Sequence, residues 1–238
     1  ALLGLVNSGA VLRIGSQPAY YSLSGADIVI PEKVTQPKKG VRDVSGDEIT
    51  NETIEEAGRI VAETDNYGPE MEMITRCLRR FPDNTDPDIV AMKVGLIDIT
   101  NSTHLSQHKS KISMVELSSI IASIPDIDAR IKAGDPEVVN QIARSNGRIN
   151  LFSFASKYCC YHNRNLYERD DYSILDTVLK EHLPLYFSDV TETQIENWRK
   201  AYNYKAYNDY ITKKLDELGI TVEFRKRKFD LFVWYKNR

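Results

Sequence analysis

The chain has 238 residues, of which 42% are hydrophobic and 27% charged, and this composition excludes a disordered or low-complexity protein. Its longest apolar run, residues 89–97, is interrupted by Lys93 and falls short of the roughly 20 residues that a membrane-spanning helix needs. Three cysteines supply neither a disulfide framework nor the four ligands of a structural zinc site. We therefore expect a cytoplasmic monomer that binds no membrane, metal or cofactor.

The net charge of −3 conceals an uneven distribution along the chain. Residues 199–238 contain eleven Lys and Arg against five Asp and Glu, a net charge of +6, so residues 1–198 carry −9. A basic C-terminal portion of this kind can bind a polyanion such as nucleic acid, even in an acidic protein.

Residues 1–47 contain no helical pattern and are rich in Gly, Ser and Pro. Two short β-like pieces, at 10–14 and 27–30, precede a cluster of breaking residues at 36–40. We expect an irregular N-terminal arm, with room for a hairpin, that carries no catalytic motif.

From Glu48 onward, apolar residues recur at helical spacing, and residues that cap helices precede the runs. Asp86 is followed by a first-turn proline, and Ser113 with Glu116 has the Ser-x-x-Glu form of a capping box. The pattern predicts an all-α body whose seventh helix stops before Pro184 and whose eighth runs unbroken over 191–218. The predicted helices begin near residues 50, 69, 86, 113, 135, 150, 173, 191 and 225.

The segment with the most chemical information runs from Asn146 to Asp176. A loop containing Gly147 joins two helices, the second helix carries a lone lysine, Lys157, and Asp176 follows 19 residues later at the start of the next helix. An amine is nucleophilic at neutral pH when desolvation or a nearby cation keeps it partly uncharged, and a carboxylate opposite it can stabilise developing positive charge. The backbone amides of a helix-loop-helix can bind phosphates, so Asn146, Gly147 and Arg148 are candidate DNA-binding residues.

The order and spacing of these residues resemble the helix-hairpin-helix DNA glycosylase superfamily, most closely the bifunctional 8-oxoguanine DNA glycosylases. In that family a hairpin with the sequence Leu-Pro-Gly-Val-Gly-x-Lys precedes a catalytic Asp by about this separation. Residues 151–157 align with the hairpin motif, and residues 174–176 align with the Pro-Val-Asp that ends in the catalytic residue. The resemblance implies a base-excision glycosylase with AP lyase activity on oxidised purines in damaged double-stranded DNA. It implies that Lys157 attacks C1′ and forms a Schiff base, while Asp176 supports the oxocarbenium character of the sugar.

The same resemblance implies roles for residues elsewhere in the chain. Asn101, in a segment similar to the asparagine-rich segment that those enzymes push into DNA, would face the gap left by the flipped base. The basic C-terminal helix would contact phosphates. The implied arrangement has two helical lobes, 48–85 with 170–238 and 86–169, with Lys157 and Asp176 in the cleft between them. The candidate phosphate contacts on the basic helix are Arg225, Lys226, Arg227 and Lys228.

Two other functions remain open. Phe152, Ser153 and Ala155 stand where the family motif has its proline and its two glycines, and the isoelectric point is near 5.9. These features favour a non-enzymatic module that binds nucleic acid or another protein on a glycosylase-like fold. A Schiff-base enzyme acting on a small carbonyl compound is the third possibility. The distance from the Lys157 amine to the Asp176 carboxylate discriminates between catalysis and a helical scaffold.

Overall fold

The computed structural model describes residues 11–14, 20–23, 47–64 and 67–237. The chain divides into two compact units, Ala1–Arg42 and Asp43–Arg238. In the first unit, β1 (Val11–Ile14) pairs antiparallel with β2 (Tyr20–Leu23), so that Val11 lies opposite Leu23. The strand expected near 10–14 is therefore confirmed, whereas the β-like piece at 27–30 lies outside the described residues.

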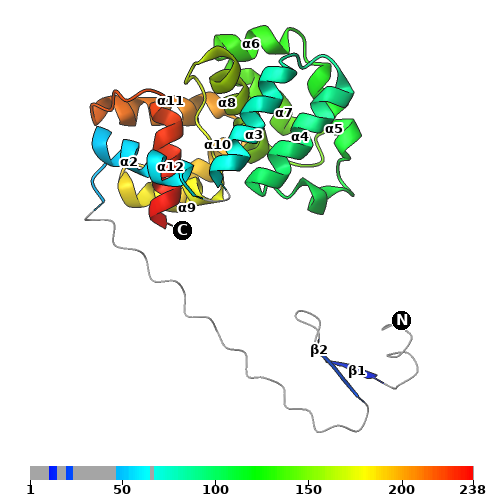
Figure 1. The fold of residues 1–238 in the computed structure, drawn as a ribbon. Coiled ribbons are helices and arrows are strands. Elements are labelled where there is room, and N and C mark those ends of the chain that lie inside the picture. Colours follow the sequence, from blue (N-terminus) through cyan, green and yellow to red (C-terminus); the bar gives the residue numbers. More distant parts are fainter. Residues whose placement is uncertain (1–10, 15–19, 24–46, 65–66, 238) are drawn as a thin grey trace. The chain divides into compact units, whose positions relative to one another are not determined.

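The described part of the second unit is helical throughout, which confirms the all-α fold class (Figure 1). Helices α2, α9, α10, α11 and α12 pack on one another, as do α3 to α8, and the two groups meet where α2 contacts α3 and α11 contacts α7. The division into two lobes and the glycosylase-like arrangement stay predictions. The helices are α2 (Asn51–Ala62), α3 (Tyr67–Arg80), α4 (Pro87–Asn101), the 3-10 helix η1 (Leu105–His108), α5 (Met114–Ala122), α6 (Ile127–Ala133), α7 (Pro136–Arg144), α8 (Phe152–Tyr167), α9 (Thr177–Tyr186), α10 (Glu192–Lys200), α11 (Tyr204–Glu217) and α12 (Arg225–Asn237).

Several helices begin where the capping residues predict. Thr50 caps α2 through a reciprocal pair of hydrogen bonds with Thr53, and the side chains of Asp86 and Asp135 accept amide hydrogen bonds at the starts of α4 and α7. Each such cap typically contributes about 1 kcal/mol to helix stability. Among the described residues, no helix has the length and apolar character that crossing a membrane requires.

Several helix boundaries differ from the prediction, and the helix predicted to begin near residue 173 begins at Thr177. The helix expected over 191–218 is two helices, because Tyr202 takes a positive φ of 53° and Asn203 caps a new start at α11. Helix α9 continues past Pro184 to Tyr186, since buried Leu183 and the contact of Tyr186 with Phe232 hold its last turn in the core. Helix α6 was not predicted, because its seven residues carry only the short Ile127 and Ile131 repeat.

Helix α8 lies at the centre of the helical unit. It contacts α3, α4, α6 and α7. Eleven of its residues between Phe152 and Asn163 are buried, and among them are the polar residues Lys157, His162 and Asn163. A helix that is buried on most of its circumference must satisfy its polar side chains inside the protein. The partners of these polar groups therefore define the candidate site.

Two glycines at helix ends should differ in how much stability the protein loses when each is replaced by alanine. Gly134 caps α6 with φ of 76°, and a Cβ added there would lie 2.6 Å from Asp171 Cβ, whereas Gly219, with φ of 66°, has open space around it. We expect Gly134→Ala to lower the free energy of unfolding by about 2–4 kcal/mol and Gly219→Ala by about 1–2 kcal/mol, because only the first adds a clash to the backbone strain. Urea denaturation of both variants measures the difference, and equal losses would contradict it.

Candidate functional site

The loop between α7 and α8 folds back against the start of α5. Asn146 Nδ2 donates to Lys111 O at 2.8 Å and to Glu116 Oε1 at 2.9 Å, and Arg148 forms an ion pair with Glu116 at 3.0 Å. Ser113 caps α5 as expected, because its hydroxyl accepts a hydrogen bond from Glu116 N at 3.0 Å. Exposed Gly147, with φ of 77°, permits the turn. The DNA-binding role of Asn146, Gly147 and Arg148 stays a prediction.

The lysine and the aspartate singled out in the sequence lie together. Lys157 is the sixth residue of α8, and its Nζ lies 3.1 Å from Asp176 Oδ2. The two side chains are 9% and 18% exposed, so the ion pair is largely shielded from solvent. Asp176 is also the N-cap of α9, where Oδ1 accepts a hydrogen bond from Leu179 N at 3.1 Å. One carboxylate thus caps a helix with one oxygen and holds the amine with the other.

Buried side chains fix the segment that carries Asp176. Ser156, next to Lys157 on α8, accepts a hydrogen bond from Leu175 N at 3.1 Å. From the other side, Tyr204 and Tyr207 of α11 donate to the carbonyls of Ser173 and Ile174, at 2.8 and 2.6 Å. Both tyrosines are fully buried. The Lys157–Asp176 geometry is therefore set by rigid elements and not by a loose loop.

A second ion pair lies beside the first. Arg227 and Asp230, both on α12 and both buried, pair with each other. Burial raises the pKa of Asp230 to about 6, against the lowering effect of Arg227, and Asp176 and Lys157 act on the same carboxyl. We call Lys157, Asp176, Arg227 and Asp230 the buried charge cluster. Its two cations and two anions balance, which is the condition for keeping charges in a low-dielectric interior.

Polar neighbours extend the buried charge cluster toward the end of α4. Arg227 Nη2 donates to the hydroxyls of Tyr67 and Tyr161, and Tyr161 lies one turn beyond Lys157 on α8. The Tyr161 hydroxyl donates in turn to Asn101 Oδ1. The structure therefore brings Asn101, which the sequence analysis placed at a DNA-facing wedge, into contact with a partner on the helix of Lys157. Its Oδ1 is engaged inside the protein.

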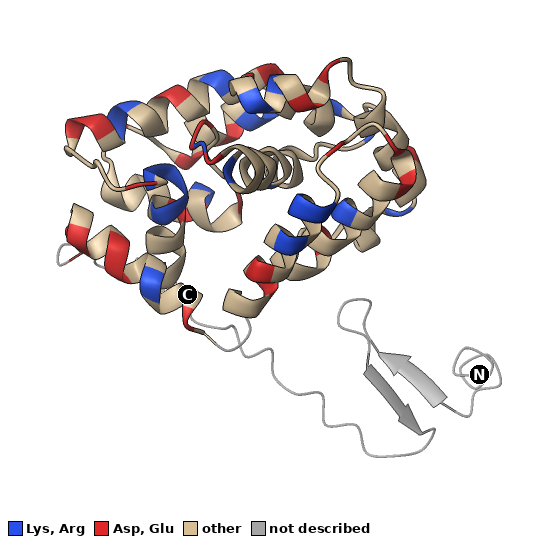
Figure 2. Ribbon diagram, turned by 45° about the horizontal axis from the view of Figure 1, so that its top comes forward, with Lys and Arg blue, Asp and Glu red and all other residues tan. Residues whose placement is uncertain are grey.

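Two residues of the basic C-terminal run are buried, and the other two form ion pairs nearer the surface. Lys226 and Arg227 are 7% and 4% exposed, and Lys226 Nζ donates to Asp171 O at 2.9 Å. Arg225 pairs with Asp216, and Lys228 pairs with Glu55 of α2. Figure 2 shows Lys and Arg interspersed with Asp and Glu over the helices. To bind a phosphate, each of these four basic side chains must give up its present partner within the chain.

Asp230 and Tyr161 also belong to the site, although the sequence did not predict them there. Asp230 follows Arg227 by three residues and lies between Phe229 and Phe232, so a charged pair at helical spacing within an apolar stripe was the available signal. In the part of the chain that the structure describes, no three His, Cys, Asp or Glu side chains gather in a way that could hold a metal ion.

Comparisons with known proteins match the first part of the helical unit. A family model described as an N-terminal domain, HI_0787_N, matches residues 51–166, from the start of α2 into the last turn of α8. An uncharacterized protein of Haemophilus influenzae is 28% identical over an alignment of 120 residues, which covers 48% of this chain and 52% of that protein. The chain thus spans about half the length of this curated relative. No solved structure matches the chain.

Proposed function

We propose that the protein is a base-excision DNA glycosylase with AP lyase activity on oxidised purines such as 8-oxoguanine, and that Lys157 is its nucleophile. The observation that carries the proposal is the shielded 3.1 Å contact between Lys157 and Asp176, on a helix that follows a loop from α7. Desolvation favours the neutral lysine amine that Schiff-base chemistry needs, and a fixed carboxylate within reach can accept the proton that the amine gives up.

The chain supplies groups for each step of that reaction. Attack requires the neutral amine, so a proton must leave Lys157 Nζ, and Asp176 Oδ2 is a carboxylate within reach of it. As the amine bonds to C1′, the bond from C1′ to the purine nitrogen breaks and the base leaves with the electron pair. Opening of the sugar ring gives the Schiff base, and loss of a C2′ proton expels the 3′ phosphate. Once the proton taken from Lys157 has passed to the departing base, Asp176, held by the amide of Leu179, is again a carboxylate and would stabilise the positive charge on the sugar.

Reduction of the Schiff base tests this proposal directly. We expect borohydride to trap a covalent complex with duplex DNA containing 8-oxoguanine, and Lys157→Gln to abolish the trapped complex. Lys200→Gln removes the same charge from α10, where the lysine side chain is 68% exposed, and should leave trapping intact. Gel shift at low salt verifies that both variants still bind DNA. A complex that forms with Lys157→Gln, or no complex with any oxidised purine, would overturn the assignment.

A binding module without catalysis is the second candidate, and the pairing of the basic run within the chain favours it. Arg225, Lys226, Arg227 and Lys228 all have internal partners, so the helix offers less positive potential at the surface than its sequence indicates. Salt-dependent affinity for DNA without base release supports a nucleic-acid-binding module. Absence of DNA affinity at low salt supports a module that binds another protein.

A further inference from the structure

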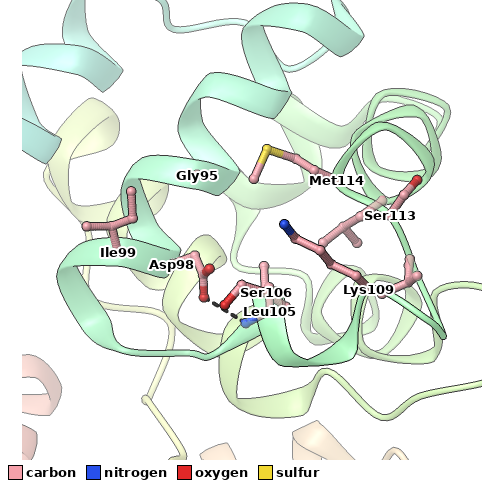
Figure 3. Close-up of a pocket in the computed structure, with 10 residues that line it drawn as sticks. Gly95, Asp98, Ile99, Leu105, Ser106, Lys109, Ser113 and Met114 are labelled. Carbon is pink, nitrogen blue, oxygen red and sulfur yellow. Dashed lines mark hydrogen bonds between the residues drawn. The ribbon is translucent and has the colours of Figure 1, made fainter. Parts of the chain in front are cut away.

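A pocket of about 250 Å3 lies between α4, η1 and α5, and no residue of the buried charge cluster lines it (Figure 3). Its wall is mostly apolar, with Leu105 and Leu117 at its base and Ile99 and Met114 at its edge. Ile99 is 79% exposed and Met114 is 45% exposed. Apolar side chains that remain open to water around a concave surface are a common feature of ligand sites.

Helix α4 carries a glycine where the Met114 side chain of α5 lies against it. Gly95 lines the pocket, and the Met114 side chain lies across it, with its terminal methyl 3.5 Å from where a Cβ on Gly95 would be. An engineered cavity of about 150 Å3 accepts benzene, so a pocket of this volume can accept an apolar group of about eight carbons. A larger residue at position 95 would occupy the same space.

One end of the pocket is positive. Lys109 lines it, is exposed, and has no hydrogen-bond or ion-pair partner among residues 47–64 and 67–237. Figure 3 shows its side chain extended over the pocket toward Met114. Ser113, the N-cap of α5, lines the same end, and the first-turn amides of a helix favour an anion there. The pocket therefore has one cation, Lys109, without a partner among the described residues.

The other end carries Asp98, near the C-terminus of α4. Its Oδ1 accepts hydrogen bonds from Thr103 Oγ1 at 2.5 Å and from Leu105 N at 2.9 Å, so the carboxylate closes the loop that follows the helix. The carboxylate and the helix C-terminus repel an anion at this end. The two ends together impose one orientation on an anionic ligand, with its head at Lys109.

We propose that this pocket binds a small amphiphilic carboxylate, a monoanion of six to eight carbons (an estimate from the cavity comparison above). The carboxylate head pairs with Lys109 beside the start of α5, and the apolar body lies against Leu105, Leu117 and Met114. This binding site is independent of the Lys157 chemistry and would operate in either function proposed above.

Calorimetric titration of the full chain with octanoate, hexanoate and octylammonium tests the proposal. We expect octanoate to bind roughly tenfold more tightly than hexanoate, because two further methylenes are removed from water, and octylammonium to bind more weakly than octanoate. Lys109→Gln should weaken octanoate binding about three- to fivefold. Lys111→Gln is the matched control, because this lysine is exposed two residues further along the chain and does not line the pocket.

Gly95→Leu provides a second arm, since the added side chain fills the pocket and should weaken octanoate binding about tenfold or more. Circular dichroism verifies that every variant keeps its helix content. The proposal is overturned by octylammonium binding as tightly as octanoate, by equal effects of Lys109→Gln and Lys111→Gln, or by octanoate binding that Gly95→Leu leaves unchanged. It is also overturned if no saturable binding of octanoate occurs, a result that points to a protein partner for this surface.

Discussion

Replacing Arg227 with methionine is expected to lower the free energy of unfolding by about 3–5 kcal/mol. Arg227 is 4% exposed, pairs with Asp230 and donates to the hydroxyls of Tyr67 and Tyr161. Methionine fills much of the same volume but leaves the Asp230 carboxylate buried without its cation, and an unpaired buried charge accounts for most of the expected loss. Urea denaturation followed by circular dichroism measures it.

Two control variants separate the buried pair from the general cost of altering α12. The double variant Arg227→Met/Asp230→Leu removes both charges and should recover a large part of the loss, because no buried ion is left unpaired. Arg225→Met, in the first turn of the same helix, removes an arginine whose ion-pair partner Asp216 is 59% exposed, and should cost less than about 1 kcal/mol. Losses of equal size for Arg225→Met and Arg227→Met would show that the second ion pair is not held in the interior.

Local chemistry explains which parts of the fold the sequence could predict. Asp86, Ser113 and Asp135 each cap a helix through their own first-turn amides, so these starts depend on a few neighbouring residues and were found correctly. Asp176 is likewise a helix cap, and it follows the polar loop at the end of the helix that carries Lys157. The proximity of Lys157 and Asp176 was predicted from the family motif that they match, and the structure brings them into contact.

The burial and pairing of the basic run could not be predicted, because they depend on contacts between distant elements. Lys228 meets Glu55, and Arg227 meets Tyr67, each more than 150 residues away in sequence. The apolar residues Phe229, Phe232 and Val233 of α12 are buried, but charged residues of the same helix are buried with them, and the sequence does not indicate this second group. The break between α10 and α11 likewise depends on a left-handed backbone conformation at Tyr202, and the sequence has no glycine there to indicate it.

Helix α8 also carries a buried histidine, His162, whose surroundings predict how the stability of the protein depends on pH. His162 is fully buried and stacks on Tyr158, with ring centroids 4.1 Å apart. The Tyr158 hydroxyl donates to Asn84 Oδ1, which also accepts from Lys93 Nζ at 3.0 Å. His162 Nδ1 lies 2.7 Å from Tyr158 O, and its Nε2 has no hydrogen-bond partner. Burial, with the charge of Lys93 acting in the same direction, lowers the pKa of His162 to about 3.

His162 should therefore make the wild-type protein lose stability in acid relative to a His162→Phe variant. The unfolded chain binds a proton at this residue as the pH falls through 6.5, whereas the folded protein does not until about pH 3. The histidine contribution is thus fully present above pH 6.5 and declines below it, by about 1.4 kcal/mol per pH unit. Phenylalanine keeps the ring on Tyr158 but does not titrate. We expect the variant to gain about 2–3 kcal/mol on the wild type between pH 6.5 and about pH 4.5, measured by urea denaturation.

The effect of His162 must be measured by comparing variants, because Asp230 changes the stability of the wild-type protein over the same pH range. Its pKa, raised by burial from 3.8 to about 6, makes the folded protein bind a proton before the unfolded chain does. Its contribution is therefore fully present below pH 3.8 and is lost as the pH rises through 6, opposite in sign to that of His162 over the same window. Asp230→Asn should accordingly lose stability relative to the wild type on acidification, while His162→Phe gains. Parallel pH profiles for the wild type and His162→Phe would mean that His162 already accepts its proton in the folded protein near pH 6.5, and that the stacked pair with Tyr158 is open to water.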